Sequence, residues 1–216
     1  MTADKFSMKP SINRIAMISV HACPEGLLGS KNAGGMNVYV GQIAKELSER
    51  NVHVDIFTRS HDSHIETIDV FGDKVRIVHI PSGHLEDTKN SIYGSLPEFT
   101  CNLVKFIEEK SLAYDLIHSH YWFSGRVANV LANLLNVPHI TVFHTLAETK
   151  NRARVGEKEP EERFISEKKI VKSTDSIIAF SRHEKEILIN SYGAPSEKIS
   201  IIPCGVDIDR FKPIGY

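Results

Sequence analysis

Two short runs of the sequence place polar and aromatic side chains directly after strand-like segments. Residues 118–122 (HSHYW) follow the strand-like segment 114–117, and His144 and Thr145 follow the segment 138–143. Imidazoles and hydroxyls donate and accept hydrogen bonds, and imidazoles also bind metals. Hydrogen bonding is favoured over a metal here, because the two histidines of the first run are not flanked by a cysteine or a carboxylate. The runs predict a polar site where two strands end.

A pair of glycines, Gly34 and Gly35, precedes an amphipathic segment at residues 36–47. Unpaired amides and the dipole at a helix N-terminus favour an anion, and glycine lets a phosphate approach closely. The alternative is that the pair only forms a tight turn. The loop carries neither the G-x-G-x-x-G fingerprint of dinucleotide binding nor the G-K-[ST] element of a phosphate loop. We therefore expect an anion site outside both of those classes.

The charge-rich stretch at residues 157–169 (EKEPEERFISEKK) predicts a helix that begins after Pro160. Arg163 and Glu167 are four residues apart, which is typical of an ordinary intrahelical ion pair. An arginine in the first turns of such a helix can instead face a pocket and bind a phosphate with two hydrogen bonds. Both interpretations of Arg163 stay open from the residues alone.

Strand-like and helix-like segments alternate along most of the chain. Strands are predicted at residues 14–20, 52–58, 74–80, 114–119, 138–143 and 176–180, with a weaker candidate at 64–70. Helices are predicted at residues 36–47, 96–110, 123–135, 161–172 and, from a Ser-x-x-Glu capping pattern, 181–193. This order is typical of an α/β fold with a doubly wound, mostly parallel sheet. Ligands of such sheets bind where the strands end, so the loops at 21–35, 81–95, 118–124 and 144–160 are the candidates.

The length of 216 residues suits one α/β domain. We predict a polar leader at residues 1–12, a domain at 13–203 and an interdomain linker at 204–216, with the next domain absent from this chain. Apolar residues make up 41% and charged residues 25% of the sequence, and no run approaches the roughly 20 apolar residues that span a bilayer. We expect a soluble protein without a transmembrane segment.

Charge and cysteine content narrow the classes of partner. The 26 basic residues nearly balance 27 acidic residues, giving a net charge of −1, so a nucleic-acid partner is not expected. Cys23, Cys101 and Cys204 are odd in number, far apart and outside metal-ligand spacing, so we predict reduced thiols and no metal site. Residues 1–10 lack the apolar core of a secretory signal, which together with the thiols predicts a cytoplasmic location.

Five short motifs together resemble glycosyltransferase family four. They are residues 33–40 (AGGMNVYV), 56–59 (IFTR), 118–122 (HSHYW), 144–146 (HTL) and 203–207 (PCGVD). The resemblance spans residues 14–213, and the combination is most similar to the transferases of the mycothiol pathway and then to sucrose-phosphate synthases. It implies the GT-B architecture of two Rossmann-like domains, of which this chain would be the N-terminal, acceptor-side half.

The resemblance implies a donor side to the site. Gly34 and Gly35 would lie against the donor diphosphate. His144 would lie near the anomeric carbon, contact the transferred sugar and act as the catalytic residue.

The resemblance also implies an acceptor side. Asn37 would reach the acceptor pocket beside Met36, and Tyr121, Thr145 and Arg163 would hold the acceptor phosphate. Lys89 is aligned with a lysine of the same function, although the loop at 81–95 differs from the family pattern in length and sequence.

The implied reaction is a retaining transfer from a nucleotide sugar, expected to be a UDP-sugar, to a small phosphorylated polyol or sugar. The donor phosphate would help to deprotonate the acceptor, so no enzymic nucleophile and no further cofactor are required. Most nucleotide contacts would belong to the missing C-terminal domain, so this half alone is not expected to complete the reaction. Alternatives are a lipid or oligosaccharide acceptor and a standalone phosphometabolite-binding module, and a nicotinamide-dependent dehydrogenase is disfavoured. A homodimer is left open.

Overall fold

The computed structural model describes residues 11–25, 34–61, 67–85, 87, 89–153, 158–208 and 211–213. Its strands are β1 (Arg14–Ile18), β2 (His53–Arg59), β3 (Ile68–Gly72), β4 (Val75–Ile80), β5 (Leu116–His120), β6 (His139–Val142), β7 (Ser176–Ala179) and β8 (Ile199–Ile201). Its helices are α1 (Gly35–Glu49), α2 (Lys89–Glu109), α3 (Tyr121–Leu135), α4 (Ala147–Ala153), α5 (Glu161–Ser173), α6 (Arg182–Tyr192) and the short 3₁₀ turn η1 (Ser196–Lys198).

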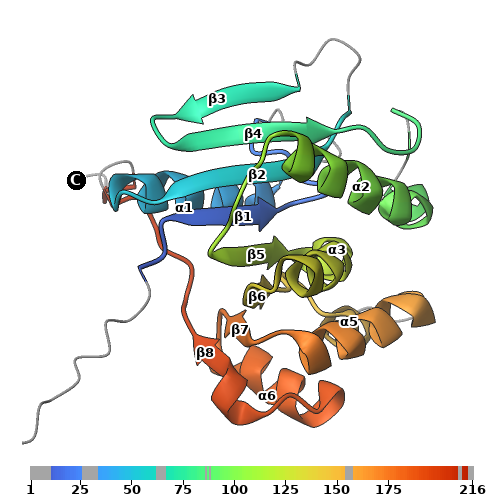
Figure 1. Ribbon diagram of the computed structural model, residues 1–216. Coiled ribbons are helices and arrows are strands. Elements are labelled where there is room, and N and C mark those ends of the chain that lie inside the picture. The colour runs from blue at the N-terminus through green and yellow to red at the C-terminus, as the bar shows by residue number, and fades with distance from the viewer. Residues whose placement is uncertain are drawn as a thin grey trace, which may run out of the picture.

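The eight strands form one sheet in the order β3-β4-β2-β1-β5-β6-β7-β8. β3 pairs with β4 in antiparallel orientation, and the other neighbours pair in parallel. Figure 1 shows α1 behind this sheet and α2 and α3 in front of it. The predicted α/β fold with a doubly wound, mostly parallel sheet is confirmed.

The core consists of two apolar clusters, one on each face of the sheet. In β1, Ala16 and Ile18 belong to the cluster under α2 and α3, whereas Met17 belongs to the cluster under α1. Successive side chains of a strand point to opposite faces, so a strand covered on both faces must be apolar throughout. This explains why the uninterrupted apolar run of β1 predicted a central strand.

Three elements differ from their predictions. β3 spans Ile68–Gly72, whereas the weaker strand candidate was placed at residues 64–70. α2 begins at Lys89 rather than at residue 96 and contains Pro97. Proline inside a helix costs stability, but buried Leu96, Phe99 and Leu103 anchor this helix to the core. α4 lies inside the stretch 144–160 that was predicted as a loop. Its seven residues are too few to show a helical apolar repeat, and α4 is held by contacts with α5 and α6.

The helix predicted at 181–193 is confirmed as α6. The Ser181 hydroxyl accepts a hydrogen bond from the Glu184 amide at 3.1 Å, and Gly193 ends the helix with φ of 73°. Residues 1–10, 209–210 and 214–216 lie outside the described residues, so the predicted leader and linker stay predictions in those parts. Among the described helices, none combines the length and apolar character needed to cross a membrane.

Candidate functional site

The ends of β5, β6 and β7 bring together a group of rings that we call the histidine cluster: His118, His120, His144, Tyr39 and Phe180. Nδ1 of His120 lies 3.1 Å from Nε2 of His144, and the rings of His118 and His120 are 4.3 Å apart. The ring of Tyr39, from α1, lies 5.2 Å from those of both His144 and Phe180. The predicted polar site at the strand ends is present. Tyr39 and Phe180 were not predicted, because neither is a polar group at a strand end.

Two residues at this edge have a left-handed backbone. His144 has φ of 61° and is the central residue of a three-residue turn, in which the Thr145 amide donates to the Phe143 carbonyl at 2.7 Å. Tyr121 has φ of 74°. Such conformations are unfavourable for side chains with a Cβ, cost about 1–3 kcal/mol each and collect at functional sites. Both strained residues lie just after a strand, at the edge where ligands of parallel sheets bind.

The three histidines of the cluster are neutral near pH 7. Burial lowers the pKa of His118 to about 4 and that of His144 to about 3, and it lowers the pKa of His120 well below its usual value. A ring N–H of either His120 or His144 therefore donates to an unprotonated nitrogen of the other. His144 can hydrogen-bond a neutral sugar hydroxyl, but it does not supply a positive charge.

Gly34 and Gly35 lie at the start of α1. A Cβ on either glycine would meet no atom of the described residues within 4 Å, and Gly34 has an extended backbone with φ of −153°. Residues 26–33, which precede these glycines, lie outside the described residues, so the anion site and the tight turn both stay predictions.

Asn37 is committed to the loop rather than to an open pocket. Its Oδ1 accepts from the Gly34 amide at 3.0 Å, and its Nδ2 donates to the Cys23 carbonyl at 2.7 Å. The side chain is buried, with 4% exposure. Asn37 therefore ties the loop after β1 to the first turn of α1, and its contact with an acceptor stays a prediction.

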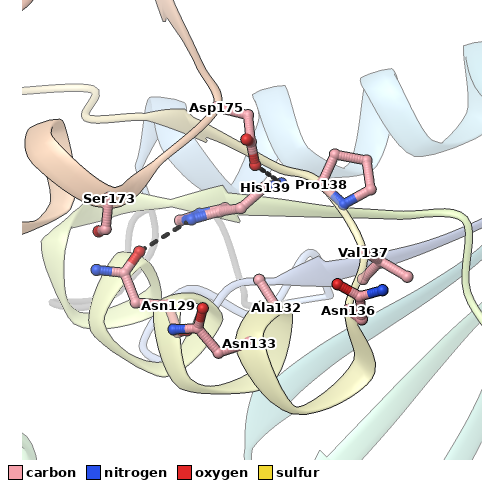
Figure 2. A pocket seen from close by; sticks show the side chains of 9 residues that line it. All are labelled: Asn129, Ala132, Asn133, Asn136, Val137, Pro138, His139, Ser173 and Asp175. Atoms are coloured by element: carbon pink, nitrogen blue, oxygen red, sulfur yellow. Dashed lines mark hydrogen bonds between the residues drawn. The ribbon is translucent and has the colours of Figure 1, made fainter.

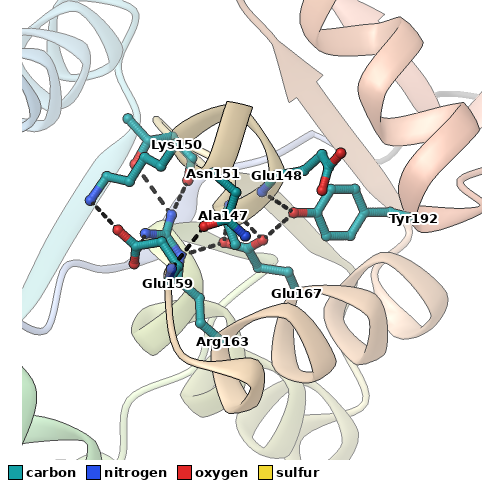
Figure 3. Close-up of polar contacts among 9 residues, drawn as sticks. Ala147, Glu148, Lys150, Asn151, Glu159, Arg163, Glu167 and Tyr192 are labelled. Atoms are coloured by element: carbon teal, nitrogen blue, oxygen red, sulfur yellow. Dashed lines mark hydrogen bonds and ion pairs between the residues drawn. The ribbon is translucent and has the colours of Figure 1, made fainter. Parts of the chain in front are cut away.

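Arg163 lies at the centre of a polar network between α4 and α5 (Figure 3). Its Nε donates to Glu167 at 2.7 Å and its Nη1 to Glu159 at 2.8 Å. Its Nη2 donates to the carbonyl oxygen of Thr145 at 2.5 Å. The intrahelical ion pair between Arg163 and Glu167 that the four-residue spacing predicted is therefore present. The guanidinium is buried and already has two carboxylate partners, so its role as a phosphate clamp stays a prediction.

Glu167 joins three helices in the same network (Figure 3). Its carboxylate accepts from the Tyr192 hydroxyl at 2.6 Å and from the Ala147 amide at 3.0 Å. Burial raises the pKa of Glu167, while the neighbouring Arg163 opposes that shift. The amide of Ala147 is one of the unpaired donors of the first turn of α4, so Glu167 holds this short helix in place.

A pocket of about 350 Å³ opens beside this network. It is lined by Tyr93, Tyr121, Trp122, Phe123, Lys150, Glu159, Pro160, Glu162 and Arg163. The predicted acceptor residues Tyr121 and Arg163 therefore meet at one pocket, with the guanidinium 4.9 Å from the centre of the tyrosine ring. Thr145 adjoins it through its bond to Arg163.

Lys150 was missed because it lies on α4, the helix that the sequence did not predict. Its Nζ is 2.9 Å from Oε1 of Glu159. Lys89 is the first residue of α2, and its side chain lies outside the described residues.

A second pocket, of about 420 Å³, lies at the opposite edge of the sheet, where β6 begins (Figure 2). Its polar groups are bonded to one another: Nδ1 of His139 is 3.0 Å from Oδ1 of Asn129, and the His139 amide donates to Asp175 at 2.8 Å. Parallel sheets bind ligands at the other edge. This pocket is therefore the weaker candidate.

Comparison with known proteins places the chain in a family. Residues 33–210 match the model of Glycosyltransferase Family 4. The chain is 38% identical over 204 residues to a D-inositol 3-phosphate glycosyltransferase of Xylanimonas cellulosilytica, covering 93% of this chain and 49% of that protein. It is 40% identical over 204 residues to the protein of the same name from Corynebacterium jeikeium, covering 93% and 48%.

Among solved structures, sucrose-phosphate synthase from Thermosynechococcus elongatus superposes with a TM-score of 0.85 at 29% identity, covering 94% of this chain and 50% of that one. The chain thus spans about half the length of the relatives that it matches. The family match covers most of the chain and includes the ends of β5, β6 and β7 that form the site. The resemblance drawn from the sequence motifs is confirmed, and the chain belongs to glycosyltransferase family 4.

Proposed function

We propose that this chain is the acceptor-binding part of a retaining glycosyltransferase that moves a sugar from a nucleotide-sugar donor, expected to be a UDP-sugar, to a small phosphorylated polyol or sugar. The relatives named for D-inositol 3-phosphate support a phosphorylated polyol as acceptor. One observation carries the proposal: Lys150 and Arg163 share a single carboxylate at the wall of the 350 Å³ pocket.

The donor end of the site consists of the start of α1 and the neutral His144. The N-terminus of α1, which begins at Gly35, suits a diphosphate. His144 hydrogen-bonds the transferred sugar from its strained turn between β6 and α4. The rest of the nucleotide contacts belong to a C-terminal domain outside this chain.

The acceptor end is the pocket beside Arg163. One oxygen of Glu159 is 2.9 Å from the Lys150 ammonium and the other is 2.8 Å from the Arg163 guanidinium. A bound phosphate would bridge two cations in the same way, with charge-assisted hydrogen bonds. In this proposal Glu159 occupies the phosphate position until the acceptor displaces it, and Tyr121 and Thr145 complete the pocket.

The transfer itself requires no nucleophile from this chain. The bond between the anomeric carbon and the donor phosphate oxygen breaks, and a bond from that carbon to the acceptor hydroxyl oxygen forms on the same face. The hydroxyl proton passes to the departing phosphate, so atoms and charge balance with a nucleoside diphosphate as the second product.

Calorimetric titration of the full-length enzyme with inositol phosphate and with inositol tests the acceptor end. Lys150→Met should weaken inositol phosphate about 10- to 150-fold, because a charge-assisted hydrogen bond contributes about 1.5–3 kcal/mol. Inositol itself should bind equally well to both proteins. The matched control is Lys169→Met, which removes an exposed lysine of α5.

Equal weakening of both ligands by Lys150→Met would contradict the phosphate role. Glu159→Gln sharpens the test, since removing the competing charge should strengthen inositol phosphate binding. A lipid or oligosaccharide acceptor is one alternative, and it predicts that inositol phosphate and inositol bind no differently. A standalone phosphometabolite-binding module is the other; it would also prefer inositol phosphate, but the full-length protein would then transfer no sugar from a UDP-sugar to it.

A further inference from the structure

We propose that Cys23, His61 and His79 form a zinc site at the carboxyl edge of the sheet. Cys23 lies in the loop after β1, His61 follows β2, and His79 lies near the end of β4. The potential ligand atoms of the three side chains all lie within 4.8 Å of one another. These residues are 38 and 18 positions apart in sequence and meet because β1, β2 and β4 are neighbours in the sheet.

His79 is oriented as a metal-binding histidine is. The ring is buried, with 2% exposure, and its Nε2 lies 2.9 Å from Oδ2 of Asp69. An ionised carboxylate only accepts hydrogen bonds, so Nε2 must carry the proton and Nδ1 must present a lone pair. A carboxylate that fixes the tautomer of a ligand histidine is the usual support of a zinc site.

Nδ1 of His79 is the unexplained atom of this region. It is buried and has no hydrogen-bond partner among the residues that the structure describes. Buried polar atoms are normally bonded, and an unbonded one is costly. Because Asp69 accepts the proton on Nε2, the lone pair on Nδ1 points away from Asp69. A metal ion bound to Nδ1 would give this lone pair a partner.

The ligand set fits zinc. One thiolate and two imidazoles are ligands that Zn²⁺ prefers, with metal distances of about 2.0–2.3 Å in tetrahedral geometry. Ligand atoms of such a site are roughly 3.3–3.6 Å apart, so no separation between two ligand atoms would need to shrink by more than about 1.5 Å. Cys23 and His79 are buried and His61 is exposed, so the His61 side chain has the most room to approach the other two.

A fourth ligand is available nearby. A carboxylate oxygen of Glu25 lies within 4.8 Å of ligand atoms of Asp69 and His79. Glu25 or a water molecule would complete the tetrahedron.

The site would stabilise a loop that the proposed function uses. The carbonyl of Cys23 accepts a hydrogen bond from Asn37, whose other amide atom holds Gly34. A zinc ion bound to the thiolate would fix both ends of the connection between β1 and α1. This consequence rests on the proposed function, but zinc binding itself does not.

The test is a zinc titration of the chelator-treated protein against a chromogenic chelator, followed by Co²⁺ substitution. The wild-type protein should bind one equivalent of Zn²⁺, and its Co²⁺ form should show a thiolate-to-cobalt charge-transfer band in the near ultraviolet. Cys23→Ser and His61→Ala should each lower the affinity on the order of 100-fold or more. Asp69→Asn should lower it about 10- to 100-fold, as expected for the partner of a ligand histidine.

The controls are Cys101→Ser and His183→Ala, which replace an exposed cysteine and an exposed histidine elsewhere on the surface. Both should bind zinc as the wild-type protein does. His61→Ala changes an exposed side chain and keeps the test decisive if Cys23→Ser fails to fold, as judged by circular dichroism. Failure of the wild-type protein to bind one equivalent would overturn the proposal. So would undiminished binding by His61→Ala or a cobalt spectrum without the thiolate band.

Discussion

The histidine cluster and the Arg163 network lie at the same edge of the sheet and both are buried, yet the histidines are neutral and the arginine is charged. Burial lowers the pKa values of His118, His120 and His144, so these rings are neutral. Burial also opposes the charge of Arg163, but Glu167 and the other partners outweigh it, and the pKa of Arg163 is raised. A buried cationic group keeps its charge only where carboxylates pair with it, so the site has a neutral part, the histidine cluster, and a charged part, the Arg163 network.

Glu167→Ala should have the largest effect, because it removes a carboxylate partner from a buried guanidinium. We expect a loss of about 3–5 kcal/mol in the free energy of unfolding, measured by urea denaturation. The double variant Arg163→Met/Glu167→Leu should lose much less, since it leaves no unpaired charge. A loss below about 1 kcal/mol for Glu167→Ala would contradict the idea that this pair keeps the charged part stable.

His144→Ala in the full-length enzyme should lower turnover on the order of 100-fold while the fold stays intact, because it removes a preorganised hydrogen-bonding group from the reacting sugar. His144→Gly should be about as inactive. It should nevertheless be more stable than His144→Ala by about 1 kcal/mol, because glycine accepts the positive φ without strain. Turnover at the wild-type level in either variant would remove His144 from the catalytic site.

Acid should destabilise the neutral part. His118 and His144 have folded-state pKa values of about 4 and about 3, below the value of about 6.5 in the unfolded chain. Their contribution is complete above about pH 6.5 and is lost as the pH falls toward 4, because only the unfolded chain takes up protons there. Each such histidine contributes a slope of about 1.4 kcal/mol per pH unit.

Urea denaturation at several pH values between 7.5 and 4.5 measures this slope. His118→Gln should reduce the slope of the free energy of unfolding against pH by the contribution of one histidine. An unchanged slope in that variant would show that His118 is not protonated on unfolding in this range.

The smallest effect should come from Arg50 and Glu46, which form an ion pair with the same four-residue spacing as Arg163 and Glu167. Both side chains are mostly exposed, so alanine at either position should change the free energy of unfolding by no more than about 0.5 kcal/mol. Urea denaturation of these two variants, compared with Glu167→Ala, measures how much of the ion pair's contribution to the free energy of unfolding comes from burial rather than from spacing. A loss above 2 kcal/mol would contradict this separation.

Much of the site could be predicted because its residues follow strands directly. The carboxyl ends of parallel strands meet at one edge, so the positions of Tyr121, His144 and Thr145 followed from the order of the segments. Lys150 could not be predicted, because α4 shows no apolar repeat and is held by the distant Glu167. The three proposed zinc ligands could not be predicted from their spacing either, because they come from three separate strand ends. The proposed site revises the expectation that the protein binds no metal.

The sequence by itself determined the alternation of strands and helices, the family motifs, the glycines before α1 and the capping of α6. These depend on side-chain periodicity and on contacts between residues a few positions apart, which the order of residues specifies directly. Only the tertiary structure decided that Arg163 shares Glu159 with Lys150, that the histidines of the cluster are neutral, and that Cys23 lies beside His61 and His79. Charge state and coordination depend on burial and on distances between remote segments, and these exist only once the sheet has brought the segments together.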